Sequence, residues 1–137
     1  MVILVGLVGG LYDAFTGKIP NWLTFSSMGL GLVIKGFSGD FSKALVGLIV
    51  GILIYLPFFA FGYMGGGDVK LMGAIGCFTG VDGVLYTALL GSIFGGLLAL
   101  IALCRKQKYV RYGIAIGLGL VTFEVLQWLN WPLPLLY

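Results

Sequence analysis

Histidine is absent from this chain of 137 residues, and cysteine occurs only twice, as Cys77 and Cys104. Structural zinc sites take four ligands that come mainly from cysteine and histidine, so a zinc site of the usual kind is excluded. Both cysteines lie within apolar stretches, which argues against a disulfide. We therefore expect no bound metal and no cofactor.

Charged residues are also scarce in this sequence. They make up only 9% of the chain, and eight basic residues stand against five acidic ones. The basic residues are too few and too scattered for a nucleic-acid-binding surface, so we expect no nucleic acid as a partner. Hydrophobic residues make up 60% of the chain and the mean hydropathy is +1.10, values typical of an integral membrane protein surrounded by lipid.

Apolar stretches separated by short polar segments predict the fold. Strands are not expected, because the stretches lack the alternation of a lipid-facing barrel. We expect an all-α polytopic membrane protein, a compact bundle of about six transmembrane helices in a single domain, residues 1–137. No basic segment precedes the first helix, so we interpret it as part of the mature protein and not as a secretory signal. The predicted helices cover residues 2–15, 22–37, 43–62, 69–81, 84–104 and 112–130.

Glycine is abundant, with 24 residues, and it recurs at four-residue spacing within the predicted helices. Small residues one turn apart let helix backbones approach closely in lipid. We expect the pairs to pack helices together and not to bind a ligand. The pairs are Gly6/Gly10, Gly47/Gly51, Gly76/Gly80, Gly91/Gly95 and Gly113/Gly117.

Basic residues are unevenly distributed among the connections between predicted helices. Most lie in or beside the first, third and fifth connections, and the positive-inside rule places those connections in the cytoplasm and both termini outside. The basic residues in or beside the first, third and fifth connections are Lys18, Lys70, Arg105, Lys106, Lys108 and Arg111. Those near the second and fourth connections are Lys35 and Lys43.

Asp13 and Asp68 stand out among the acidic residues. Asp40 and Asp82 fall in the second and fourth connections, where solvated loop residues are expected. Asp13 ends the first predicted helix and Asp68 begins the fourth, so both lie on the cytoplasmic side. A carboxylate at the edge of lipid is costly unless it pairs, lines water or performs chemistry. Two carboxylates that share a water can act as acid and base, which is the machinery of an aspartic protease.

Three glycines, Gly65, Gly66 and Gly67, immediately precede Asp68. Without a Cβ they can adopt positive φ and let a substrate strand approach the backbone beside the aspartate. The alternative is purely structural. In that case the glycines form a turn and Asp68 only caps a helix, which is a common role of aspartate.

Together these stretches resemble the GxGD membrane aspartic proteases, and most closely the type IV prepilin peptidases. The resemblance rests on Asp13 followed by "IPN" at residues 19–21, on "GGGDVKLM" at residues 65–72 and, loosely, on "YGIAIGLG" from Tyr112. It covers most of the chain. It implies that Asp13 and Asp68 are the catalytic pair of a helical bundle whose site faces the cytoplasm. In the third motif Arg111 stands where the family often has a proline.

Other residues of these motifs are expected to bind substrate or shape the site. Pro20 fixes φ and disfavours helix at the residue before it, so it separates the first two helices. Lys18 and Lys70 either reach the interface as anchors, contact an acidic group of the substrate or act on an aspartate. The full set is Gly65, Gly66, Gly67, Lys70, Lys18, Pro20 and Asn21.

The resemblance implies a multi-pass peptidase of the cytoplasmic (inner) membrane. Its expected partners are lipid and a pilin-like precursor whose basic leader precedes a hydrophobic segment, and the leader is cut off at the cytoplasmic edge. Larger bacterial members also carry a segment with four cysteines and methylate the new N-terminus. This chain shows no such segment, so we expect the short form that cleaves without N-methylation.

Two alternatives stay open. One is another GxGD protease, presenilin-like or preflagellin-type, that acts on other membrane segments. The other is a small carrier whose aspartates bind a proton or an ion, as intramembrane acids often do.

Overall fold

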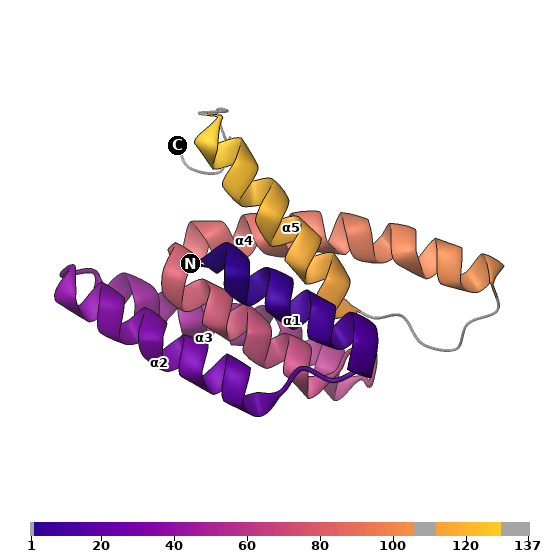
Figure 1. The fold of residues 1–137 in the computed structure, drawn as a ribbon, viewed down its shortest axis with the longest axis horizontal. Helices are drawn as coiled ribbons and strands as arrows, with labels where there is room; N and C mark the ends of the chain where they lie inside the picture. Colours follow the sequence, from indigo (N-terminus) through magenta and orange to yellow (C-terminus); the bar gives the residue numbers. More distant parts are fainter. Residues whose placement is uncertain (1, 106–111, 130–137) are drawn as a thin grey trace.

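The described part of the chain is helical. The computed structural model describes residues 2–105 and 112–129, and every regular element within these ranges is an α-helix. The helices confirm the predicted all-α class, and four of them match predicted ranges to within two residues at either end. They are α1 (Val2–Thr16), α2 (Asn21–Phe37), α3 (Phe41–Ala60), α4 (Gly66–Cys104) and α5 (Tyr112–Trp128) (Figure 1).

The fourth helix differs from the prediction of two helices, over residues 69–81 and 84–104, with Asp82 in a loop between them. The helix runs from Gly66 to Cys104 and is interrupted at Gly80, whose φ of 72° and ψ of −167° are not helical. Figure 1 shows the chain turning back there, so α4 has two arms that run in opposite directions. A single glycine with positive φ makes the reversal, so no loop is needed and Asp82 lies exposed in the helix that follows.

The first arm of α4 forms the centre of the bundle. Its Leu71 and Met72 side chains are completely buried. The arm contacts three other helices at glycines that leave room for it: Gly9 of α1, Gly31 of α2 and Gly47 of α3. The second arm packs instead against α5. The predicted bundle is therefore built around one doubled-back helix.

Close glycine contacts occur at the helix crossings, as predicted. Gly47 of α3 and Gly76 of α4 meet backbone to backbone. A Cβ built on Gly117 of α5 would lie 2.9 Å from the carbonyl oxygen of Gly6 in α1. Gly80 has a different role, because a Cβ there would meet nothing within 4 Å and its positive φ makes the reversal in α4.

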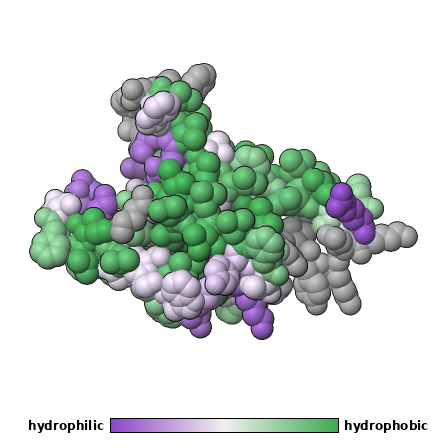
Figure 2. Space-filling model, viewed as in Figure 1, coloured by the Kyte–Doolittle hydropathy of each residue, from purple (hydrophilic) through white to green (hydrophobic). Residues whose placement is uncertain are grey.

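Apolar side chains cover the outside of the bundle. Large hydrophobic residues are exposed on all five helices, for example Phe15, Leu30, Leu53, Leu97 and Trp128. Figure 2 shows a face dominated by hydrophobic surface, with hydrophilic patches mainly toward its edges. By length and composition α3 and α4 can cross a membrane, and α1 and α5 are shorter apolar helices. An exterior of this kind needs lipid around it, so the chain is a membrane protein.

The connections between helices alternate between the two ends of the bundle. Residues 17–20 and 61–65 lie together at one end, and residues 38–40 lie at the other (Figure 1). At that other end Asp40 and Lys43 form an ion pair, in which Oδ1 of Asp40 and Nζ of Lys43 are 2.8 Å apart. Asp13, near the end of α1, and Asp68, near the start of α4, therefore lie at the same end.

The variant Gly47→Ala tests the contact between α3 and α4. A Cβ at this position would collide with the carbonyl oxygen of Gly76, so we expect a loss of about 1–3 kcal/mol in unfolding free energy, the usual cost of overpacking. Thermal unfolding in detergent should show a lower midpoint. Gly29→Ala is the matched control, because a Cβ there meets nothing within 4 Å and alanine favours helix. Equal midpoints for the two variants would contradict the tight contact.

Candidate active site

Asp68 lies in the first turn of α4 and is buried. Its Oδ2 accepts a hydrogen bond from the N–H of Gly65, the residue before the helix, at 3.3 Å. This is the reciprocal half of a capping box, so the structural role considered for Asp68 is present. This hydrogen bond involves only one oxygen of the Asp68 carboxylate, Oδ2. Oδ1 is buried and has no hydrogen-bond partner among the described residues.

Asp13 lies in the last turn of α1 and is also buried. Its Oδ2 accepts a hydrogen bond of 3.0 Å from the N–H of Gly113, in the first turn of α5. The first N–H groups of a helix have no partner within the helix, so this bond satisfies both groups. A Cβ on Gly113 would lie 2.8 Å from the same oxygen, so a larger residue would displace the carboxylate.

The structure brings Asp13 and Asp68 close enough to interact electrostatically. Their helices are in contact nearby, because Gly9 of α1 packs on Leu71 of α4: a Cβ on Gly9 would lie 2.8 Å from Cδ1 of that leucine. Two carboxylates from distant parts of the sequence thus form one buried acidic pair.

A cavity of about 570 Å³ adjoins Asp68. Its walls are the connection between α1 and α2 and the glycine segment that leads into α4. Of the predicted site residues, all but Asp13 and Lys70 line this cavity. The lining is Gly17, Lys18, Ile19, Pro20, Asn21, Gly65, Gly66, Gly67 and Asp68.

The expectation that residues 65–67 adopt positive φ is wrong. Positive φ occurs at other described glycines, of which Gly62, with φ 78°, is the nearest in sequence. Gly67 serves close packing instead. A Cβ on Gly67 would lie 3.0 Å from the Cβ of Ile19, in the facing wall of the cavity. The absence of side chains here lets the start of α4 approach the connection between α1 and α2.

Lys70 joins α4 to α2. Its Nζ donates a hydrogen bond of 2.9 Å to Oδ1 of Asn21 and lies 5.1 Å from the centre of the Phe25 ring. An ammonium group over an aromatic face is held by a cation–π interaction. Lys70 and Asn21, both predicted site residues, therefore hold two walls of the site together.

Pro20 separates α1 from α2, as predicted. It has extended backbone angles, φ −67° and ψ 135°, and immediately precedes the first residue of α2. Its carbonyl oxygen accepts hydrogen bonds from the N–H groups of Leu23 and Thr24. Lys18 is exposed in the same connection, where it lines the cavity.

Two residues beside the carboxylates are not among the predicted site residues. Gly113 lies in the loosely matching third motif and is predicted only as a packing residue, yet its N–H binds Asp13. Tyr55 of α3 is buried and interacts electrostatically with Asp68. A signal for Tyr55 exists in the sequence, because it is the one polar side chain in the apolar stretch 44–60.

The two carboxylates are placed so that they can transfer protons. Two neighbouring carboxylates can donate and accept protons, and one carboxylate oxygen has no partner in the described residues. Within residues 2–105 and 112–129, no group of three His, Cys, Asp or Glu side chains could hold a metal ion.

Comparison with known proteins identifies the family. The model of the type IV leader peptidase family matches residues 1–100 of the 137, a range that holds both aspartates and the whole lining of the cavity beside Asp68. No curated protein and no solved structure matches the chain. Since the family model covers well over half of the sequence, the chain belongs to the type IV leader peptidase family and is a membrane protease.

Proposed function

We propose that this protease is an aspartic endopeptidase in which Asp13 and Asp68 are the catalytic residues. The observation that carries the proposal is Oδ1 of Asp68. This atom is buried without a hydrogen-bond partner in the described residues, next to a second carboxylate and a 570 Å³ cavity. An unpaired buried polar atom costs about 1–3 kcal/mol. A reacting water beside Asp68 would recover that cost.

The proposed mechanism follows from the repulsion between two carboxylates. One of them holds a proton while the other is ionised. The ionised group removes a proton from water as the water attacks the peptide carbonyl, and the acid polarises that carbonyl and then protonates the leaving amine. Helix ends do not assign the two roles, because Asp13 is bound by the first turn of α5 and Asp68 lies in the first turn of α4.

We propose prepilin-like precursors as the substrates, with a basic leader that precedes a hydrophobic segment. The family supports a leader peptide as the part that is removed. The positive-inside rule keeps a basic leader in the cytoplasm and puts residues 17–20 and 61–65 on the same side of the cytoplasmic membrane. The junction between leader and hydrophobic segment would then lie at the depth of the two carboxylates.

Most of the other predicted site residues take one of three roles in this proposal. Lys18, exposed in the cavity wall, contacts acidic groups of the substrate. Lys70 and Asn21 fix α4 against α2 through their hydrogen bond. Gly65 and Gly66, which line the cavity, leave room for the unwound backbone of the substrate beside Asp68. We treat residues 1–137 as one peptidase domain, because α1 and α5 come from opposite parts of the chain and meet at Asp13.

Replacing either aspartate should abolish cleavage. We expect Asp13→Asn and Asp68→Asn each to lower the rate at least about 100-fold, because general acid–base catalysis contributes roughly 10²–10⁴-fold and one carboxylate cannot supply both groups. The assay is cleavage of a prepilin-like precursor by purified protein in detergent, followed as a leader-sized mobility shift.

Asp40→Asn and Asp82→Asn are the matched controls and should cleave at the wild-type rate, because Asp40 lies at the other end of the bundle and Asp82 is exposed beyond Gly80. The elution profile of each variant in detergent reports whether it is folded. Substantial turnover by folded Asp13→Asn or Asp68→Asn would remove the pair from the mechanism. Proton or ion transport into vesicles without any cleavage would favour a carrier.

Cleavage without methylation is a separate proposal. The described connections, residues 17–20, 38–40 and 61–65, are too short to hold a methyl-donor site. Intact-mass spectrometry of the processed precursor should give the mass of an unmodified N-terminus that begins where the basic leader meets the hydrophobic segment. A methylated N-terminus would indicate a bifunctional enzyme. A cut deep within the hydrophobic segment would indicate a presenilin-like protease.

Thiol labelling of intact cells tests the orientation. In a Cys104→Ser background, which removes the exposed native cysteine, we expect Lys18→Cys to be shielded from a membrane-impermeant reagent and Ser38→Cys to react. Both positions are exposed in the bundle, so accessibility reports the side of the membrane. The reverse pattern would place the carboxylates on the outer side and contradict cleavage of a leader in the cytoplasm.

A further inference from the structure

Tyr55 of α3 is a buried polar residue that the acid–base mechanism does not use. Only 5% of its surface is exposed, although it lies in a helix that can cross a membrane. The hydroxyl of a buried tyrosine usually has a polar partner. A purely apolar side chain would fill the same helix interface with no hydroxyl to satisfy, so the Tyr55 hydroxyl needs a physical explanation.

The register of α3 against the first arm of α4 places Tyr55 opposite Asp68. The two segments run in opposite directions, because their contacts advance four residues along α3 for every four residues back along α4. Residues four apart lie on the same face of a helix, so one further turn pairs Tyr55 with Asp68. The contacts that set this register join Gly47 to the carbonyl group of Gly76 and Gly51 to that of Met72.

Electrostatic interaction connects Tyr55 with the acidic pair. Tyr55 interacts in this way with Asp68 and with Tyr112 of α5, without a direct hydrogen bond to either. Tyr112 directly precedes Gly113, whose N–H binds Asp13. On the other carboxylate, Oδ1 of Asp68 has no hydrogen-bond partner in the described residues. Tyr55 therefore lies among the groups that surround both carboxylates.

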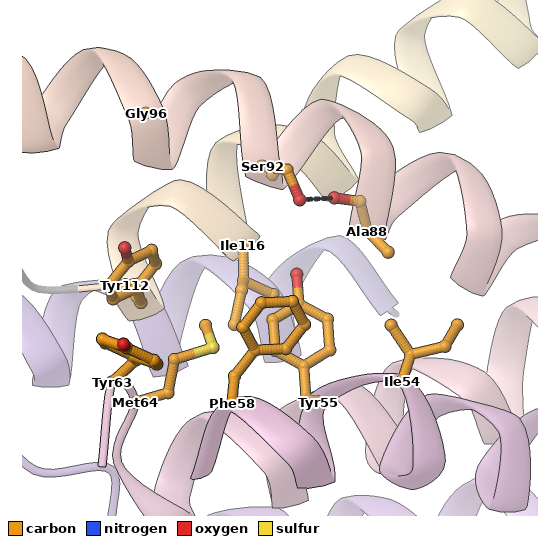
Figure 3. A pocket seen from close by; sticks show the side chains of 11 residues that line it. Ile54, Tyr55, Phe58, Tyr63, Met64, Ala88, Ser92, Gly96, Tyr112 and Ile116 are labelled. Atoms are coloured by element: carbon orange, nitrogen blue, oxygen red, sulfur yellow. Dashed lines mark hydrogen bonds between the residues drawn. The ribbon is translucent and has the colours of Figure 1, made fainter. Parts of the chain in front are cut away.

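A second cavity, of about 210 Å³, gives the Tyr55 hydroxyl room for a water. Figure 3 shows the side chain rising from α3 with its hydroxyl directed toward the second arm of α4, where a Cβ on Gly91 would lie 3.5 Å from the hydroxyl oxygen. Tyr112 lines the same cavity from α5. A buried water needs roughly two to four polar partners, and two tyrosine hydroxyls and Asp68 supply them. A water can join polar groups that are too far apart for a direct hydrogen bond.

We propose that Tyr55 is a positioning residue that acts through Asp68. Its hydroxyl donates a hydrogen bond to a water, and that water donates to the Asp68 carboxylate and stabilises its ionised form. The proposal rests on the proposed function and adds a residue to its machinery. Hydrogen bonds to a charged group are stronger than those between neutral groups. The hydroxyl thus sets the pH range over which Asp68 exchanges its proton.

The other titratable groups near Asp68 are unchanged when Tyr55 is replaced by phenylalanine. In α2 the one titratable side chain, Lys35, lies near the far end of the helix. Among the described lining residues, the second arm of α4 places no titratable side chain in the 210 Å³ cavity. The groups that remain are Asp13 of α1, Lys18 and Tyr63 of the connections, Lys70 of α4 and Tyr112 of α5.

Tyr55→Phe removes the hydroxyl and keeps the ring. We expect kcat for a prepilin-like precursor to fall about 10-fold or more with KM unchanged, because a hydrogen bond to a charged group is lost. One limb of the pH profile of kcat should move by roughly one unit toward higher pH, because a carboxylate without its donor keeps its proton to higher pH. The acidic limb moves if Asp68 is ionised in the active form, and the basic limb moves if Asp68 is protonated.

Tyr86→Phe is the matched control and should keep the wild-type kcat and both limbs. Tyr86 is also buried, but its ring stacks on Phe123 of α5 and it lines neither the 210 Å³ nor the 570 Å³ cavity. Thermal unfolding in detergent gives a measurement that needs no cleavage. Tyr55→Phe should lower the midpoint of otherwise wild-type protein but not that of an Asp68→Leu variant, which has no carboxylate for the hydroxyl to act on.

The outcomes separate this proposal from the proposed function. If Tyr55→Phe keeps the wild-type kcat and pH profile, Tyr55 does not act through Asp68, while the peptidase activity stands. An equal loss at every pH, or an equal fall in midpoint with and without Asp68, would also overturn the proposal and indicate packing, as would a Tyr55→Phe protein that does not fold. A rise in KM alone would overturn it in favour of contact with the substrate. If wild-type protein cuts no precursor at all, both proposals fall.

Discussion

Two carboxylates buried in an apolar bundle are the constraint on which the rest of this structure depends. An ion removed from water costs several kcal/mol unless other groups replace its solvation. Asp13 receives an N–H from Gly113 at the start of α5, and Asp68 receives one from Gly65 just before α4. The bond to Asp68 is made within the start of its own helix, whereas the bond to Asp13 needs the start of α5 to lie beside the end of α1. The way α1 and α5 come together is therefore tied to the solvation of Asp13.

Close backbone contact between α1 and α5 lets the bond to Asp13 form. Lipid is as apolar as the helix surfaces, so association depends on tight packing, which small residues permit. A Cβ on Gly10 of α1 would lie 3.2 Å from the carbonyl oxygen of Gly113, and one on Gly117 would lie 2.9 Å from that of Gly6. The interface that holds α1 against α5 thus also brings the N–H of Gly113 to Asp13. Packing and site geometry cannot be changed independently at these positions.

The sequence predicts those features that depend on hydropathy or on the order of helices along the chain. It predicts four of the helix ranges, and it places Asp13 and Asp68 at one end because two helices, α2 and α3, cross the bundle between them and return the chain to the same end. It does not tell why a glycine is present, since positive φ and close packing both need a missing Cβ. Gly67 and Gly80 therefore have the reverse of the roles that the sequence predicts. The bond from Gly113 depends on how α5 is rotated, and a backbone N–H leaves no mark in the sequence.

Asp68 lies at the boundary between a cavity at the end of the bundle, which it lines, and the buried interior, and this position gives the proposed reaction its setting. Hydrolysis needs water, and the cavity with Lys18 and Asn21 in its wall is lined by polar groups and lies at the end of the bundle. A hydrophobic segment needs apolar surroundings, and apolar side chains make up both the core and most of the exposed surface of the bundle. Two carboxylates in a water-exposed connection between helices would lose the burial that couples them. Two carboxylates deep in the core would have no water to activate. The boundary between the two environments is where a leader that ends at a hydrophobic segment can meet both.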